Sequence, residues 1–333
     1  MKNYNSFVRE NEVLKGHIPS MRFESGNFSE WQSEAHKKLW SLLGLDKMER
    51  CANEFEVISD TVKNGCREIK FTFQSEKNQY IPCRMLIPNG VDMPVKPVIC
   101  IQGHTTGMHI SLGEIKFDGD GDFITGGDRD FAVRAANEGY AAIAMEQRCM
   151  GECGGTADGP SCYQTAMTAL LSGRCLIGER VWDVMRLIDV LCENFEFLDT
   201  ENIMCLGNSG GGTTTFYAAC IDTRIKTAVP SCAVCTYKDS IGSLYHCACN
   251  YIPSIAEYFD MGDLGGLIAP RRLIVVNGKD DDIFPQNGVI ESYEIIQRAY
   301  DAAGVPDNCC LVTGNEGHRF YADDAWNAIK CGK

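Results

Sequence analysis

From residue 95 onward, short apolar runs alternate with longer amphipathic segments, and this alternation limits the possible folds more than any other feature. Continuous apolar runs predict strands that are buried on both faces, whereas a period of about 3.6 residues between them predicts helices. This order indicates an α/β fold with a mostly parallel central sheet and helices on both faces. The expected strands are residues 97–102, 141–145, 203–207, 226–230, 273–277 and 309–313, and the expected helices are 128–138, 175–194, 211–220 and 288–303.

The first part of the chain has a different pattern. Residues 1–52 are expected to form an N-terminal helical segment, with a helix over 29–43 that Ser29 caps and Gly44 ends. Alternating apolar residues then predict antiparallel strands at 55–62, 67–73 and 80–88. Because no repeat or linker marks a boundary, we expect one domain over residues 1–333. The long connections 147–173 and 231–266 are expected to form a cap over the carboxyl edge of the sheet, where such folds bind ligands.

Composition excludes several classes of partner. The chain has 333 residues and a formal charge of −14, so it should repel nucleic acid and anionic membranes. Its N-terminus lacks the apolar stretch of a secretory signal, and no run approaches the length of a membrane span, so we expect a cytoplasmic protein. The 18 cysteines are scattered through apolar segments and are interpreted as mostly reduced, buried thiols.

Ser209 is the candidate nucleophile. Residues 207–211 read Gly-Asn-Ser-Gly-Gly, which matches G-x-S-x-G, and they lie between a predicted strand and a predicted helix. A serine on such a sharp turn projects above the sheet at a helix N-terminus, where backbone N–H groups can stabilise an oxyanion. The context therefore favours a nucleophile over an ordinary tight turn.

A serine hydroxyl needs a base, and the base needs an acid that fixes its tautomer. His318 follows the last predicted strand, and three aspartates, Asp280, Asp281 and Asp282, follow the strand before it. The order serine, aspartate, histidine is that of α/β-hydrolases. We assign His318 as the general base and Asp281 as the acid, with Asp280 and Asp282 as the alternatives.

The oxyanion hole should combine two backbone donors. One is the N–H of Gly210, directly after the nucleophile, and the other belongs to the loop that follows an early strand. That loop is Gln-Gly-His-Thr-Thr-Gly at residues 102–107, so the second donor is the N–H of His104 or of Thr105.

These motifs resemble the dienelactone-hydrolase-like and acetyl-xylan-esterase-like branch of the α/β-hydrolases, which implies the α/β-hydrolase fold. The resemblance implies hydrolysis of carboxylic esters through an acyl-serine, often the deacetylation of carbohydrate-like esters. Two departures are Gln102, where many relatives carry histidine, and a serine nucleophile instead of the cysteine of true dienelactone hydrolases. The stretches that carry the resemblance are residues 103–107, 146–152, 178–186, 207–212 and 267–271 and the neighbourhoods of Asp281 and His318.

Other polar residues are candidates for substrate binding. Thr105 lies in the oxyanion loop, Arg148 lies in the first cap segment, and His246 lies in the second. An arginine such as Arg148 or Arg174 could bind a substrate carboxylate or hydroxyl, although a structural arginine that holds the loops is the more frequent outcome.

Two possible metal sites are set aside. Asp118, Asp120 and Asp122 resemble the start of a calcium loop, but position twelve is Arg129, so a solvated acidic loop is expected. The cysteines at 232, 235, 247 and 249, with His246, fit the spacing of no common zinc module. We therefore expect no metal and no cofactor.

The functional hypothesis is a serine carboxylesterase that acts on a small-molecule ester. A peptidase or thioesterase on the same scaffold is one alternative, and a catalytically inactive binding protein of this fold is another. The sequence does not indicate the acyl group, the alcohol or the oligomeric state.

Overall fold

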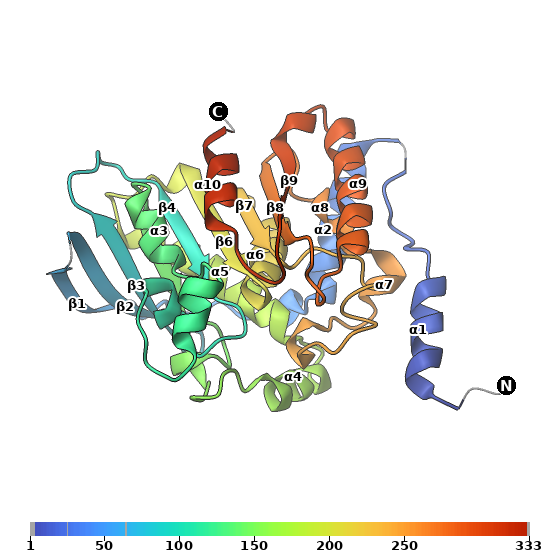
Figure 1. Cartoon of the computed structure of the whole chain (residues 1–333), viewed down its shortest axis with the longest axis horizontal. Coiled ribbons are helices and arrows are strands. Elements are labelled where there is room, and N and C mark those ends of the chain that lie inside the picture. The colour runs from blue at the N-terminus through green and yellow to red at the C-terminus, as the bar shows by residue number, and fades with distance from the viewer. Residues whose placement is uncertain (1–3, 25, 64, 332–333) are drawn as a thin grey trace.

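A nine-stranded sheet forms the centre of the computed structural model, which describes residues 4–24, 26–63 and 65–331 (Figure 1). Its strand order is β1-β2-β3-β5-β4-β6-β7-β8-β9. Strands β1 to β3 pair antiparallel and β3 pairs antiparallel with β5, whereas all pairs from β5 to β9 are parallel. The strands are β1 (Glu56–Lys63), β2 (Cys66–Glu76), β3 (Gln79–Pro88), β4 (Pro97–Ile101), β5 (Ala141–Met145), β6 (Ile203–Asn208), β7 (Ile225–Ser231), β8 (Arg272–Gly278) and β9 (Cys309–Gly314).

Helices cover both faces of this sheet. One apolar cluster contains side chains of α2, α5, α6, α8 and α9, and a second cluster on the other face contains side chains of α3 and α10. None of the helices in the described part of the chain is long and apolar enough to span a bilayer. The helices are α1 (Ser6–Gly16), α2 (Phe28–Leu42), α3 (Phe131–Asn137), α4 (Cys162–Leu171), α5 (Leu176–Asn194), α6 (Gly210–Ile221), α7 (Ile255–Tyr258), α8 (Met261–Gly265), α9 (Gln286–Ala302) and α10 (Ala322–Cys331).

The two clusters explain why the central strands are continuously apolar. Along β4, Ile99 and Ile101 belong to the first cluster, whereas Val98 and Cys100 belong to the second. Successive side chains of a strand point to opposite faces, so a strand with helices on both sides needs apolar residues at every position. Each fully buried aliphatic side chain contributes roughly 1.5–3 kcal/mol, which makes this sheet a rigid base for the loops at its edge.

The predicted fold class is confirmed, but some local predictions are wrong. Ser29 does not cap its helix: α2 begins at Phe28, and the side chain of Asn27 accepts a hydrogen bond from the N–H of Glu30 at 3.3 Å. Helix α1 lies in the segment 1–52 that was expected to be helical, whereas α4, α7, α8 and α10 were not predicted. Among these, α4 lies inside the first cap segment, where it packs against residues 247–249 of the second. The two cap segments therefore form one layer.

Candidate active site

Ser209 lies on the sharp turn between β6 and α6. Its backbone has φ 57° and ψ −126°, a region that costs roughly 1–3 kcal/mol for a residue other than glycine. The flanking glycines make the turn possible, because a Cβ at Gly211 would lie 2.1 Å from the carbonyl oxygen of Ile101, and one at Gly207 would lie 2.6 Å from the backbone of Gly211. Strand and helix approach so closely that only hydrogen fits at these two positions.

Asp281 and His318 form a hydrogen-bonded pair. His318 Nδ1 lies 2.8 Å from Asp281 Oδ2, and because a carboxylate only accepts, the Nδ1–H donates and Nε2 is left as the basic nitrogen. The other carboxylate oxygen accepts from the N–H groups of Ile283 and Phe284 at 2.9 and 3.0 Å. Asp280, in contrast, is exposed, as is Asp282.

The pKa of Asp281 follows from these contacts. Burial raises the pKa of its carboxyl, but the hydrogen bond and charge of His318 and the two N–H donors outweigh burial and hold the pKa below its usual range. Asp281 is therefore a buried anion at neutral pH. Such an anion stabilises a neighbouring imidazolium, as the acid of a proton relay must.

The histidine loop lies against the end of the strand next to Ser209. The Ser209 N–H donates to the carbonyl of Ser231 at 2.8 Å, and the Ser231 hydroxyl donates to the carbonyl of Arg319 at 3.3 Å. Phe284 stacks on the imidazole of His318 with ring centroids 6.0 Å apart. These contacts bring the carboxyl ends of β6, β7, β8 and β9 together at one edge of the sheet.

The oxyanion loop packs onto the nucleophile turn. A Cβ at Gly103 would lie 2.9 Å from Ser209 Cβ, and one at Gly210 would lie 2.7 Å from the His104 ring. The Thr105 N–H already donates to the Gly103 carbonyl at 2.8 Å, whereas that of His104 has no hydrogen-bond partner within the described ranges. Gly210 opens α6, so its N–H precedes the first hydrogen bond of the helix. His104 and Gly210 thus offer the two free donors.

A cavity of about 880 Å³ opens above Ser209 and Gly210. Both cap segments contribute to its walls, and the side chains are mostly apolar or aromatic. The histidines are its only titratable nitrogen groups, since the wall residues in the described part of the chain include no lysine, arginine, aspartate or glutamate. The other residues of its wall are His104, Pro160, Cys162, Tyr163, Met167, Leu170, Tyr245, His246, Cys247, Ala248, Asn250, Tyr251, Ile283 and Phe284.

A model of the Abhydrolase family matches residues 11–177 of this sequence. The chain belongs to the Abhydrolase family. Ser209, Asp281 and His318 lie outside the matched residues, so their assignment depends on the geometry described above.

Curated and solved proteins agree with this membership. The Bacillus subtilis (strain 168) protein named "Putative hydrolase YtaP" is 24% identical over 296 residues, which cover 86% of this chain and 94% of that protein. A structure described as "a putative acetyl xylan esterase" from Bacteroides fragilis NCTC 9343 has a TM-score of 0.78 at 18% identity, with 94% of this chain and 83% of that chain covered. Acetyl Xylan Esterase 1 from Thermoanaerobacterium sp. JW/SL YS485 has a TM-score of 0.64 at 16% identity, with 97% and 98% covered. These likenesses show the Abhydrolase fold, and the family and the curated relative support hydrolase activity.

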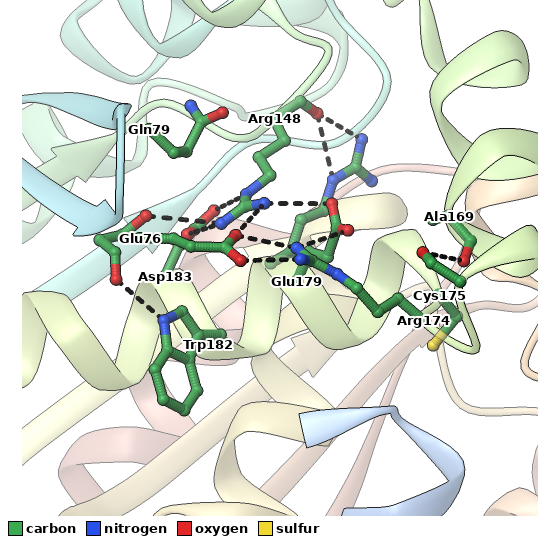
Figure 2. Close-up of polar contacts among 12 residues, drawn as sticks. Glu76, Gln79, Arg148, Ala169, Arg174, Cys175, Glu179, Trp182 and Asp183 are labelled. Atoms are coloured by element: carbon green, nitrogen blue, oxygen red, sulfur yellow. Dashed lines mark hydrogen bonds and ion pairs between the residues drawn. The ribbon is translucent and has the colours of Figure 1, made fainter. Parts of the chain in front are cut away.

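In this Abhydrolase chain, Arg148 lies outside the wall of the cavity above Ser209, where a substrate ligand is expected. It is buried and points toward the carboxylates of Glu76, Glu179 and Asp183 (Figure 2). Its Nε and Nη2 each donate to Asp183 at 2.8 Å, and its Nη1 donates to Glu179 at 3.1 Å and to Glu76 at 3.2 Å. Arg174 donates to the same Glu76 at 2.7 and 2.8 Å. These contacts favour the structural alternative for the two arginines, which join α5 to β2.

The other two candidate binding residues differ from each other. His246 is in the cavity wall, where its Nε2 lies 3.0 Å from the Ser240 hydroxyl, and burial lowers its pKa to about 4. His246 is neutral at physiological pH and lies in the cavity wall, so its role as a substrate contact stays a prediction. Thr105 is buried outside the cavity wall, and its hydroxyl has no partner among the described residues. The prediction that Thr105 binds substrate is not supported by this position.

The acidic loop is not solvated throughout, contrary to expectation. Asp118 and Asp122 are exposed, but Asp120 is buried and accepts hydrogen bonds from the Thr106 hydroxyl at 2.5 Å and from His109 Nε2 at 2.9 Å. Burial opposes ionisation, yet these bonds and two backbone N–H donors lower the Asp120 pKa to about 2. Asp120 therefore anchors the chain that follows the oxyanion loop.

Glu146 is a second anchor that sequence reasoning did not assign. Its carboxylate accepts from the N–H of Met108 at 3.2 Å and from that of Glu152 at 3.3 Å, so it joins the oxyanion loop to the first cap segment. Burial raises its pKa to about 7 despite these donors. The sequence signal was the pair Gly107 and Gly151, where a Cβ would lie 3.0 and 2.1 Å from Glu146 Oε2.

Proposed function

We propose that this chain is a serine carboxylesterase with Ser209 as nucleophile, His318 as general base and Asp281 as the acid that orients the histidine. The observation that carries the proposal is the 2.8 Å bond between His318 and buried Asp281 at the same sheet edge as the strained Ser209 turn. An aspartate, a histidine and a serine at a strand-to-helix elbow fulfil the roles of acid, base and nucleophile in acyl transfer.

In the proposed mechanism, His318 Nε2 removes the Ser209 proton as the hydroxyl oxygen attacks the ester carbonyl. The N–H groups of His104 and Gly210 stabilise the oxyanion, and the imidazolium then protonates the leaving alcohol. A water molecule, deprotonated by the same imidazole, attacks the acyl-serine and releases the acid. Asp281 stays ionised throughout and stabilises the imidazolium, because its pKa lies below its usual range.

The cavity wall supports an uncharged ester as substrate. Aromatic residues such as Tyr163, Tyr245 and Tyr251 can pack on a sugar ring, whereas a substrate carboxylate would find no lysine or arginine among the wall residues that the structure describes. The names of two structural neighbours, Acetyl Xylan Esterase 1 and a protein described as "a putative acetyl xylan esterase", indicate the same class of substrate for those proteins. We therefore propose an acetylated carbohydrate, or a similarly neutral acyl ester, as the substrate class. No disulfide joins any of the 18 cysteines, all of which are among the described residues, and this supports the proposed cytoplasmic location.

Hydrolysis of a nitrophenyl acetate tests the nucleophile. The Ser209→Ala variant should fold normally and lose hydrolysis by a factor of about 10⁴ or more, because it lacks the attacking oxygen. Ser172→Ala changes an exposed serine at the end of α4 and should retain full activity as the matched control. A fluorophosphonate should label the wild-type protein at Ser209. Undiminished turnover by Ser209→Ala would refute the assignment, and a wild-type chain that neither reacts nor turns over would favour a binding protein.

A pair of esters with one leaving group tests the charge of the substrate. Nitrophenyl acetate should be hydrolysed with a higher kcat/KM than nitrophenyl hemisuccinate, since the second places a carboxylate in a wall without cationic partners. Equal values would contradict the proposed neutral substrate. Acyl-thioesters and aminoacyl amides, assayed in parallel, separate an esterase from the thioesterase and peptidase alternatives.

A further inference from the structure

Four potential metal ligands converge where the two cap segments meet the oxyanion loop. The Nε2 or Nδ1 of His104 and the Sγ atoms of Cys162, Cys247 and Cys249 all lie within 4.8 Å of one another. His104 follows β4, Cys162 opens α4, and the other two cysteines lie at the start of a short 3-10 turn, Ala248–Asn250, in the second cap segment. Three segments that are distant in the sequence therefore bring one nitrogen and three sulfurs to one point.

This donor set has the chemistry of a structural zinc site. Zinc binds three thiolates and one imidazole in a tetrahedron with Zn–S near 2.3 Å and Zn–N near 2.0–2.1 Å, which places the ligand atoms about 3.5–3.8 Å apart. His104 Nε2 is already 3.1 Å from Cys249 Sγ. Because no two of the four ligand atoms are more than 4.8 Å apart, only small side-chain rotations are needed to bring them to the spacing of a tetrahedral zinc site. Four protein ligands close the tetrahedron, so such a zinc would hold structure and leave no position for a reacting water.

The charge of Arg180 is an independent observation that points to the same site. This side chain is 1% exposed, and it forms no ion pair with a carboxylate in the described part of the chain. Its Nη2 instead donates to Cys162 Sγ at 3.2 Å and to the Arg148 carbonyl at 2.8 Å, and its Nη1 has no partner there. A buried guanidinium without a counter-charge is costly. Three thiolates and one Zn²⁺ carry a net charge of −1, which would neutralise Arg180, whereas three neutral thiols would leave it uncompensated.

We propose that His104, Cys162, Cys247 and Cys249 bind one zinc ion that fastens the cap to the oxyanion loop. This proposal departs from the expectation of no metal. It also replaces the ligand set considered from sequence spacing: Cys235 donates to the carbonyl of Pro285, and His246 lies against Ser240, so neither belongs to the four. His104, Cys162 and Cys247 are also wall residues of the cavity above Ser209. The zinc would therefore fix one wall of that cavity and the imidazole that covers Gly210.

Metal content of the intact protein is the direct test, and it does not depend on catalysis. Protein purified under reducing conditions from zinc-supplemented cells, without chelators, should contain about one zinc per chain by inductively coupled plasma mass spectrometry. The double variant Cys162→Ser/Cys249→Ser should contain less than about one tenth of that amount, because two of four ligands are lost. Cys205→Ser is the matched control: this buried thiol donates to the Thr215 hydroxyl, so a serine keeps a partner, and zinc content should stay at the wild-type level.

A second measurement uses the wild-type chain alone, in case the double variant does not fold. Replacement of zinc by Co²⁺ should produce thiolate-to-cobalt charge-transfer bands and the intense visible bands of a tetrahedral site. An organomercurial that blocks thiols should release the zinc to a chromogenic indicator. Three results would overturn the proposal: wild-type protein that stays free of zinc after anaerobic reconstitution, a disulfide between Cys162 and Cys249 in freshly isolated protein, or an undiminished zinc content in the folded double variant. Loss of esterase activity alone bears on Ser209 and leaves the zinc measurement unaffected.

Discussion

Replacement of Glu146 by glutamine should change how the stability of the protein depends on pH. The carboxyl is 2% exposed, and burial raises its pKa from 4.5 to about 7. The folded state therefore binds more protons than the unfolded state between these two values. The free energy of unfolding falls with rising pH wherever the folded state binds more protons than the unfolded state. Glu146 therefore makes the protein less stable as the pH rises through this range.

The expected size follows from the pKa difference. A shift of about 2.5 pH units at 1.36 kcal/mol per unit corresponds to about 3 kcal/mol. The stabilising contribution of protonated Glu146 is complete below about pH 4.5 and is lost as the pH rises through about 7. A glutamine has no such titration and keeps an oxygen that can accept from the N–H of Met108.

Urea unfolding of the wild type and of Glu146→Gln at pH 5 and pH 8 measures the effect as a double difference, so that titration of all other groups cancels. Relative to the variant, the wild type should lose about 2.5 kcal/mol between the two pH values, since a small part of the titration falls below pH 5. Glu196→Gln, an exposed carboxylate that forms no ion pair among the described residues, is the control and should parallel the wild type. Parallel curves for the wild type and Glu146→Gln would refute the reasoning, because they would mean that the buried carboxyl does not change its proton affinity on folding.

Three further substitutions test other parts of the structure. Asp281→Asn should lower kcat by about 10³–10⁴-fold with little change in folding, whereas Asp280→Asn, beside it but exposed, should stay active; equal effects would place the acid elsewhere. Asp183→Ala leaves buried Arg148 without its two-bond partner and should cost about 3–5 kcal/mol in chemical denaturation, so a loss below about 1 kcal/mol would contradict the importance of that pair. Gly211→Ala would place a Cβ 2.1 Å from the Ile101 carbonyl oxygen and should destabilise the chain by about 1–3 kcal/mol or more, while Gly126→Ala, with no atom within 4 Å, should be neutral in the same thermal melt.

The features that local sequence patterns determine were predicted well. The apolar runs of β4 to β9 and the glycines around Ser209 report constraints that act within a few residues, namely burial on both faces and a tight turn. The order of Ser209, Asp281 and His318 was informative because parallel strands end at one edge of the sheet. The sequence favoured Asp281 but left Asp280 and Asp282 as alternatives, since the decision depends on which side chain turns inward.

The features that depend on contacts between distant segments were not predictable from sequence. Arg148 lies at the carboxyl edge of the sheet, as expected, but its guanidinium points toward Glu76, Glu179 and Asp183, which come from two other elements. The N-cap of α2 was misplaced by two residues because Ser29 and Asn27 are both good capping residues, and tertiary packing decides between them.

The proposed zinc ligands also come from segments that are distant in the sequence, so their spacing did not indicate a metal site. Known zinc modules have ligands in pairs that are close in sequence, and only Cys247 and Cys249 meet that condition here. His104 and Cys162 join them because the oxyanion loop and the N-terminus of α4 both lie under the second cap segment. A bound zinc would join His104, which lies against Gly210, rigidly to the second cap segment. The width of the cavity above Ser209 would then depend on metal coordination as well as on packing.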